Sequence, residues 1–436
     1  MHTKISLGRS GWVAITNYTT VGLFFIASVI SARLLGPEGR GELAVIQNWA
    51  LFAVTIGTLG IPIATAYYAG KRPADTPHIF ISAEIMLALL SIPVGIVTYW
   101  AMPWLIPNQN ADLIQDARMF LWLIPIQFTL HLPYYVILGL NRLRLWNVIR
   151  LQLPLLWLLV FAIGYAQNTL TPTYAARGYL VISVLNGVAW LIALLLVVRG
   201  AYFPKLLWFS TLFRYGLPSA LGSAPRQLNL RGDQLLMAAL LPAEMLGLYV
   251  VAVAWSGLLQ PMTSALAQTI FPSLAGQYDQ KEQERLLQRT LRLTILVSLL
   301  AGSLMLMLTP ILIPMVYGQE FAESVPAAFV LVFGALIAGM NNVLEDAFRG
   351  LGIPKWPMIA ELSGLISTAI LLLLLLPRFQ LMGAAVASLI SYLVICAILM
   401  VFLRKWVNEP IVSYLIPQPH DAHALFGRLY TYFFQR

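Results

Sequence analysis

The chain alternates long apolar stretches with short polar connections along almost its whole length. A bilayer-spanning helix needs about 20 mostly apolar residues. The strict apolar–polar alternation of a membrane β-barrel is missing from the sequence. The pattern predicts an all-α, polytopic integral membrane protein with about 12 transmembrane helices, at residues 10–35, 43–69, 79–102, 115–140, 148–167, 179–198, 215–241, 246–272, 289–313, 326–350, 356–376 and 383–403.

Composition supports the membrane assignment and excludes several classes of protein. Of the 436 residues, 59% are hydrophobic and only 10% are charged, against about 25% charged in ordinary soluble domains. A soluble enzyme could not cover its surface with so few charges, and a disordered chain needs the opposite balance. The single cysteine, Cys396, excludes a disulfide framework and a cysteine-based metal site.

Basic residues mark every second connection between the apolar stretches. The net charge of +9 reflects this pattern, which sets membrane topology, and we therefore expect no nucleic-acid partner. The alternate connections hold only Arg33, Arg40, Arg118, Arg177 and Arg378. Because cytoplasmic loops carry the excess of Lys and Arg, both termini should be cytoplasmic. The basic set is Lys4, Arg9, Lys71, Arg72, Arg142, Arg144, Arg150, Arg199, Lys205, Arg214, Lys281, Arg285, Arg289, Arg292, Arg349, Lys355, Arg404, Lys405, Arg428 and Arg436.

Two segments of the chain resemble each other. Residues 34–45 align with residues 240–251, matching Leu34, Leu35, Glu38 and Gly41 to Leu240, Leu241, Glu244 and Gly247. Parallel repeats of this kind build transporters from two lobes related about an axis along the membrane normal. We therefore predict six-helix lobes at residues 1–200 and 215–405 around a central cleft, an interfacial cytoplasmic linker at 201–214 and a cytoplasmic tail at 406–436.

Ionisable residues inside the predicted spans are candidates for function, because each costs about 2.5–3.5 kcal/mol at the centre of a membrane helix. The span at 215–241 carries Arg226, Arg231 and Asp233. Two arginines against one aspartate leave a surplus positive charge, which favours binding of an anionic head group. The alternative is an internal Arg–Asp pair that holds helices together. Arg33 either adds to the same positive lining or extends to the outer interface.

Acidic residues supply candidates for coupling transport to H⁺ or Na⁺. Asp233 is the preferred one because it lies deep in its span beside the arginines. Glu84 and Glu361 each lie about six residues inside their spans and could instead pair with a loop cation. Glu345 and Asp346 lie near Arg349, and a local ion pair at i, i+4 is the favoured interpretation there.

The remaining polar residues give no pattern typical of catalysis. Gln127 and His131 share a helix face, and a hydrogen bond to a neighbouring helix is favoured over a proton relay. No spacing of His, Asp and Glu suits a metal, Gly70-Lys71-Arg72 lacks the rest of a phosphate-binding loop, and the predicted outer loops are short. We therefore expect no enzyme activity and no cofactor.

Several short motifs resemble those of polysaccharide flippases of the O-antigen type, within the multidrug/oligosaccharidyl-lipid/polysaccharide exporter superfamily. The likeness extends over nearly all of the chain. It is strongest in residues 32–41, in Leu59-Gly60 leading to Tyr67-Tyr68-Ala69-Gly70, in Tyr215-Gly216-Leu217-Pro218, in residues 231–236 and in Phe271-Pro272.

The resemblance implies a flippase in a prokaryotic inner membrane that moves a polyprenyl-diphosphate-linked oligosaccharide to the outer leaflet. It implies a cationic cleft for the diphosphate, to which Arg33, Arg226, Arg231 and Asp233 are carried over, and contacts with other polysaccharide-assembly proteins. Three alternatives stay open: a multidrug exporter of the same superfamily, a membrane-embedded polymerase or ligase, and a scaffold of an assembly complex.

Overall fold

The computed structural model describes residues 7–407, 409–416 and 418, and every regular element in them is a helix. The all-α prediction is therefore confirmed for this part of the chain. Contacts divide the chain into two units, residues 1–250 and 251–436. The sequence-based lobes, at residues 1–200 and 215–405, divide the chain elsewhere, and their boundaries stay a prediction.

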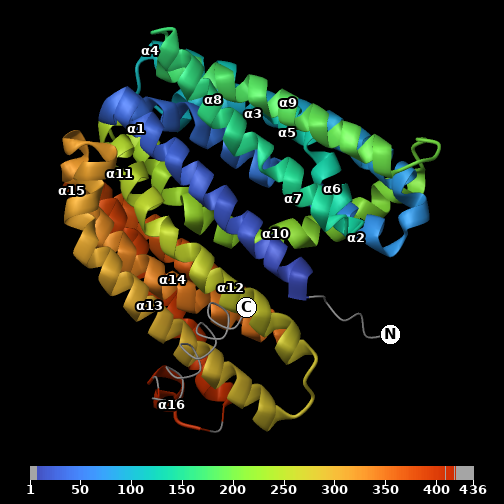
Figure 1. Cartoon of the computed structure of the whole chain (residues 1–436), viewed down its shortest axis with the longest axis vertical. Coiled ribbons are helices and arrows are strands. Elements are labelled where there is room, and N and C mark those ends of the chain that lie inside the picture. Colours follow the sequence, from blue (N-terminus) through green and yellow to red (C-terminus); the bar gives the residue numbers. More distant parts are fainter. Residues whose placement is uncertain (1–6, 408, 417, 419–436) are drawn as a thin grey trace. The chain divides into compact units, whose positions relative to one another are not determined.

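In unit 1 the long helix α1 packs against α3, α5 and α9, and the short α5 also packs against α3 and α9 (Figure 1). Polar side chains cap the N-termini of two helices: Asn110 accepts a hydrogen bond from the amide of Leu113 at the start of α4, and Thr171 accepts one from the amide of Tyr174 at the start of α9. The elements are α1 Leu7–Gly57, α2 Ile61–Lys71, η1 Pro73–Asp75, α3 Thr76–Leu105, α4 Ala111–Phe120, α5 Leu123–Leu130, α6 Leu132–Gly139, α7 Leu143–Arg150, α8 Gln152–Ala166, α9 Pro172–Val197, α10 Leu206–Leu240 and most of α11 Ala243–Ser256.

Unit 2 is built around a core of leucine, isoleucine and aromatic side chains from α12 to α16. Arg292 Nε donates to the carbonyl of Ser413 at 2.7 Å, which ties α16 to α13. The rest of the predicted tail, residues 419–436, lies outside the described residues. The elements are η2 Gly257–Leu259, α12 Gln260–Ala275, α13 Gln280–Tyr317, η3 Gln319–Ser324, α14 Val325–Gly350, α15 Lys355–Trp406 and α16 Val412–Leu415.

Nine helical segments of the described chain are long and apolar enough to cross a membrane. Two of them run past a backbone interruption: the one in α15, interrupted at Gln380 (φ 44°), covers two predicted spans, and the one in α1, interrupted at Gly36 (φ 68°), covers most of the first predicted span and about half of the second. A Cβ on Gly383 would lie 2.4 Å from the carbonyl oxygen of Leu375. Eight residues of straight helix would separate them by about 12 Å, so the chain folds back there. The protein is a multi-pass membrane protein, and the count of twelve stays a prediction.

The two halves of the sequence repeat meet inside unit 1 through their glycines. A Cβ on Gly41 would lie 1.6 Å from the carbonyl oxygen of Ala243, and a Cβ on Gly247 would lie 1.9 Å from that of Pro37. Each residue of one pair corresponds to a residue of the other in the alignment of 34–45 with 240–251. The contact is therefore reciprocal, as a pseudo-two-fold arrangement requires, and only a residue without a side chain fits at either position.

The predicted linker is attached to the start of α3. The amide of Lys205 donates to Ser82 Oγ at 3.1 Å, and His78 Nδ1 lies 2.8 Å from the carbonyl oxygen of Phe203. The Tyr202 hydroxyl donates to the carbonyl of Val198 at 2.9 Å, and burial raises the pKa of this phenol. Phe203 and Lys205 of this segment are exposed, and its interfacial position stays a prediction.

Candidate functional site

The second half of α1 ends at Gly57, and a turn at residues 58–60 separates it from α2. Leu59 (φ 49°) and Gly60 (φ 71°) both take left-handed conformations before α2 resumes at Ile61. Such a conformation costs a residue with a Cβ roughly 1–2 kcal/mol. Gly60 also lies against α10, because a Cβ there would be 2.2 Å from the carbonyl oxygen of Gly216. Gly60 and Gly216 face each other at this point, and the absence of side chains lets the broken helix and α10 approach closely.

A second helical stretch of unit 1, residues 123–139, is also interrupted near its middle. α5 ends at Leu130 and α6 begins at Leu132, with His131 (φ −94°, ψ −9°) between them. Pro133 has no backbone N–H, so it cannot donate to the carbonyl of Thr129 and the regular ladder stops. Non-helical backbone at membrane depth is tolerated only where protein covers it or where it lines an aqueous cavity.

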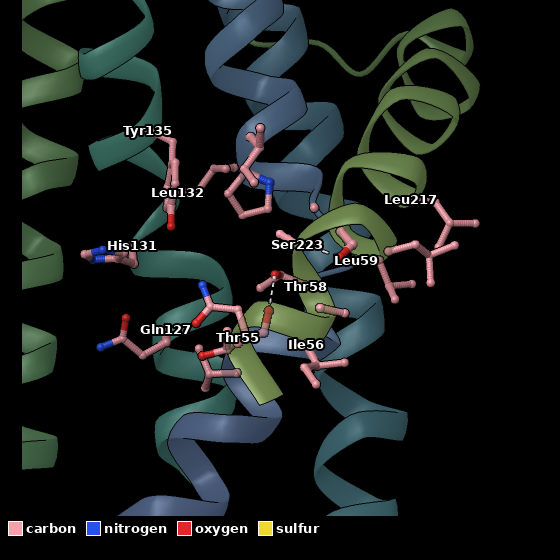
Figure 2. Close-up of a pocket in the computed structure, with 18 residues that line it drawn as sticks. Thr55, Ile56, Thr58, Leu59, Gln127, His131, Leu132, Tyr135, Leu217 and Ser223 are labelled. Atoms are coloured by element: carbon pink, nitrogen blue, oxygen red, sulfur yellow. Dashed lines mark hydrogen bonds between the residues drawn. The ribbon is translucent and has the colours of Figure 1, made fainter. Parts of the chain in front are cut away.

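A cavity of about 340 Å³ lies where these two breaks face α10 (Figure 2). In Figure 2, Thr55, Thr58 and Leu59 come from α1 and the turn after it, Gln127 and His131 from the α5–α6 segment, and Ser223 from α10. This volume is at the lower end of the range of roughly 300–1,000 Å³ for small-ligand pockets. The cavity is lined only by uncharged residue types and histidine, all within unit 1.

Polar side chains of this cavity keep hydrogen-bonding capacity for a ligand. The hydroxyls of Thr55 and Ser223 donate to the carbonyls of Leu51 and Ala220 at 2.8 and 3.1 Å, which leaves their oxygen lone pairs as acceptors. Among the described residues, the amide of Gln127 has no hydrogen-bond partner, and the same holds for Gln227. The structure describes no hydrogen bond from Gln127 or His131 to a neighbouring helix among these residues, and His131 stacks on Tyr134 with ring centroids 4.8 Å apart.

The charged residues of α10 face different neighbours. Arg231 is four residues beyond Gln227, on the same helix face one turn farther along, and it is half-buried. Asp233 is buried, and its Oδ2 accepts a hydrogen bond of 2.5 Å from the Tyr249 hydroxyl of α11. Arg226 is half-buried and projects about 100° away from Gln227.

Two further predicted residues of unit 1 lie in contrasting surroundings. Arg33 is exposed, three residues before the interruption of α1 at Gly36. Glu84, on α3, is half-buried, and its Oε2 atom is fully buried with no hydrogen-bond partner among the residues that the structure describes. A carboxylate in that position is costly unless a proton or cation neutralises it.

The predicted acidic residues of unit 2 occupy two helices. On α14, Arg349 bridges Glu345 at 2.9 Å and Asp346 at 2.7 Å, so the expected local ion pair is confirmed. Glu345 is almost fully buried, whereas the Arg349 side chain is 36% exposed. Glu361 is buried near the start of α15.

The sequence interpretation missed most of the residues that line the cavity. Thr55, Thr58, Tyr135, Ser223 and Gln227 are ordinary polar residues in long apolar spans, and their types carry no special chemistry. The available signals were local: a Gly-x-Pro sequence at 60–62 and a His-x-Pro sequence at 131–133. Both patterns break a helix, and a broken membrane helix points to a binding site.

Two family models match more than half of the chain each. The model described as polysaccharide biosynthesis protein matches residues 7–277, and that described as lipid II flippase MurJ matches residues 155–417. The chain belongs to the polysaccharide biosynthesis protein family. This agrees with the flippase resemblance of its motifs and with the multidrug/oligosaccharidyl-lipid/polysaccharide exporter superfamily.

Curated relatives of this family member are distant but cover most of the chain. The probable low-salt glycan biosynthesis flippase Agl15 of Haloferax volcanii is 23% identical over 87% of this chain and 79% of its own length. The capsular polysaccharide biosynthesis protein CapF of Staphylococcus aureus is 24% identical over 85% of this chain and 92% of its own.

Solved structures with the same fold include flippases and drug exporters. Lipid II flippase MurJ in an inward closed conformation has a TM-score of 0.75 at 13% identity, over 96% of this chain and 92% of its own. An inward-facing multidrug resistance transporter of the MATE family has a TM-score of 0.73 at 13% identity, over 89% and 94%. At these identities the likeness concerns the fold alone.

Proposed function

We propose that this protein is a flippase that moves a polyprenyl-diphosphate-linked oligosaccharide from the cytoplasmic to the outer leaflet. The observation that carries the proposal is α10, a helix of the family's fold that carries Arg226 and Arg231 and also lines the cavity through Ser223 and Gln227. Arginine suits a diphosphate because its planar guanidinium makes charge-assisted, bidentate contacts. The family match to a lipid II flippase model and the flippase names of relatives support this substrate class over a cationic drug.

The proposed cycle is one of alternating access driven by an ion gradient. Discontinuous helices near the site, such as α1–α2 and α5–α6, are typical of secondary transporters. Glu84 is the strongest candidate to carry the coupling proton because its buried Oε2 lacks a hydrogen-bond partner among described residues. Asp233, preferred from the sequence, stays a candidate, although its carboxylate already accepts the Tyr249 hydroxyl. Glu345, Asp346 and Glu361 are weaker ones.

The cellular setting follows from the substrate. We place the chain in the cytoplasmic membrane of a prokaryote, with both termini cytoplasmic, where it supplies a surface-polysaccharide pathway and contacts its assembly proteins. In this role the chain transports its substrate and leaves polymerisation and ligation to others. O-antigen is one product that such a pathway could make.

The test is transport of a fluorescent short-chain polyprenyl-diphosphate oligosaccharide in proteoliposomes. We expect the intact protein to move it across the bilayer, Arg226→Ala and Arg231→Ala each to abolish this movement, and Arg214→Ala to leave it unchanged. Arg214 is a matched control because it is an exposed arginine on the same helix. Normal movement by both variants would contradict the cationic site. Export of cationic dyes in place of the lipid would favour the multidrug alternative.

A further inference from the structure

The cavity between α1, α5, α6 and α10 differs chemically from the arginine positions. Its lining offers amides, hydroxyls, a phenol, apolar carbon and the imidazole of His131, which stacks on Tyr134, with no Asp, Glu, Lys or Arg side chain. A phosphate or a carboxylate placed there would lose water without gaining a counter-charge, which is unfavourable. The cavity therefore selects against the anionic part of a lipid-linked glycan.

The same lining suits the hydroxyl groups of a sugar. Sugar hydroxyls both donate and accept, and the cavity supplies acceptors from Thr55 and Ser223 and amides with both functions from Gln127 and Gln227. The ring of Tyr135 and the side chains of Leu59 and Leu217 supply apolar surface for the C–H faces of a pyranose. A small-ligand pocket typically combines a few polar groups with such apolar walls.

The position of the cavity relative to Arg231 indicates which sugar would occupy it. Arg231 and Gln227 are four residues apart on one face of α10, so their Cβ atoms are about 6 Å apart. A diphosphate near Arg231 would place the sugar that is directly bonded to it within reach of Gln227. We propose that this cavity binds the uncharged, carrier-proximal sugar of the transported head group; this assignment rests on the proposed function.

The strained turn at residues 58–60 fits this assignment. Leu59 holds a left-handed conformation although it has a side chain, and both Leu59 and Thr58 line the cavity. Conformations of this cost persist where the surroundings enforce them, and they cluster at binding sites. The turn places the Thr58 hydroxyl and its neighbours around the cavity instead of continuing the helix.

Cysteine labelling can test the proposal directly, because the chain has a single native cysteine. In a Cys396→Ala background, Ser223→Cys places a thiol at the cavity and Ser210→Cys places one on the same helix outside it. Both serines are exposed and donate to a carbonyl three residues earlier, so they are matched. The measurement is the rate of N-ethylmaleimide labelling of the purified full-length protein.

The ligands are N-acetylglucosamine, glucose, glucuronic acid, inorganic pyrophosphate, and a short-chain polyprenyl diphosphate with and without N-acetylglucosamine. A ligand at about three times its Kd should slow labelling of Ser223→Cys about fourfold. We expect this from at least one neutral sugar, and at much lower concentration from the lipid-linked sugar, with Ser210→Cys unchanged. Gln127→Ala and Gln227→Ala should each weaken the protection.

Three results would overturn the proposal: no protection by any saccharide, equal protection by pyrophosphate, or equal protection by the sugar-free carrier. Equal potency of free and lipid-linked sugar would overturn the carrier-proximal assignment. Failure here is distinguishable from failure of the proposed function. Sugar protection can be lost while Arg226→Ala still abolishes lipid movement, and protection can persist in a protein that moves no lipid.

Discussion

The reciprocal glycine contact in unit 1 predicts a sharp effect of adding a single methyl group. In Gly41→Ala the new Cβ would lie 1.6 Å from the carbonyl oxygen of Ala243, and the two helices must separate by about 1.4 Å to reach a 3.0 Å contact. Overpacking usually costs 1–3 kcal/mol, and the upper end applies because both sides of the contact are backbone. Alanine regains about 1 kcal/mol of helix propensity, so the net loss should be roughly 2 kcal/mol.

The assay is heat inactivation of the detergent-solubilised protein, followed by size-exclusion chromatography of the surviving monodisperse peak. Unfolding of such proteins is often irreversible, so midpoints are compared under one heating protocol. Gly41→Ala should lower the midpoint by several degrees. Gly22→Ala is the matched control on the same helix, where a Cβ would meet nothing within 4 Å. That variant should be neutral or slightly stabilised.

The double variant Gly41→Ala, Gly247→Ala distinguishes one shared contact from two separate defects. Alone, a Cβ on Gly247 would lie 1.9 Å from the carbonyl of Pro37. A separation that already accommodates alanine at position 41 brings that distance above 3.0 Å, so the second substitution should add little. Neighbouring sites of this kind are non-additive. Additive losses, or a midpoint for Gly41→Ala equal to that of Gly22→Ala, would refute the reciprocal packing.

Three further substitutions test the buried acids. Arg349→Ala should destabilise the protein by roughly 3 kcal/mol in the same heat assay, because it removes the ion pair to the buried carboxylate of Glu345. The value is at the lower end for breaking a buried pair because Arg349 is partly exposed. Glu84→Gln should remove the dependence of lipid movement on an imposed proton gradient in proteoliposomes, and unchanged dependence would exclude that residue from coupling. Asp233→Asn should lower thermal stability, since the charge-assisted hydrogen bond from Tyr249 weakens.

Hydrophobic length was sufficient to predict the membrane fold. The burial of about 20 apolar residues per span dominates the energetics in lipid, so the positions of the helices follow from composition within windows of that size. The interruption of α1 at Gly36, directly before Pro37, also coincides with the predicted end of the first span. The family was recognisable because its short motifs cluster at these same ends and turns.

The internal breaks at residues 58–60 and 131 were not predicted, for a physical reason. A left-handed residue such as Leu59 changes the backbone direction without changing the hydropathy of its surroundings. Leucine also disfavours that conformation, so its own identity argues against the break. What enforces it is the close approach of Gly216 from a helix more than 150 positions later, and such contacts cannot be seen in a local pattern.

The charges of α10 mark candidate functional residues, but they also make this helix hard to recognise as a membrane span. α10 is not among the nine segments of the described chain that are long and apolar enough to cross a membrane, because its charges lower its mean hydropathy. It is tolerated because it packs against α1, α2 and α3. One face presents Ser223, Gln227 and Arg231 in successive turns, whereas Asp233 bonds to Tyr249 on another side. The sequence identifies the charges, and the packing separates them: Ser223, Gln227 and Arg231, proposed to contact sugar and phosphate, lie on one face of α10, and the Asp233–Tyr249 hydrogen bond lies on another.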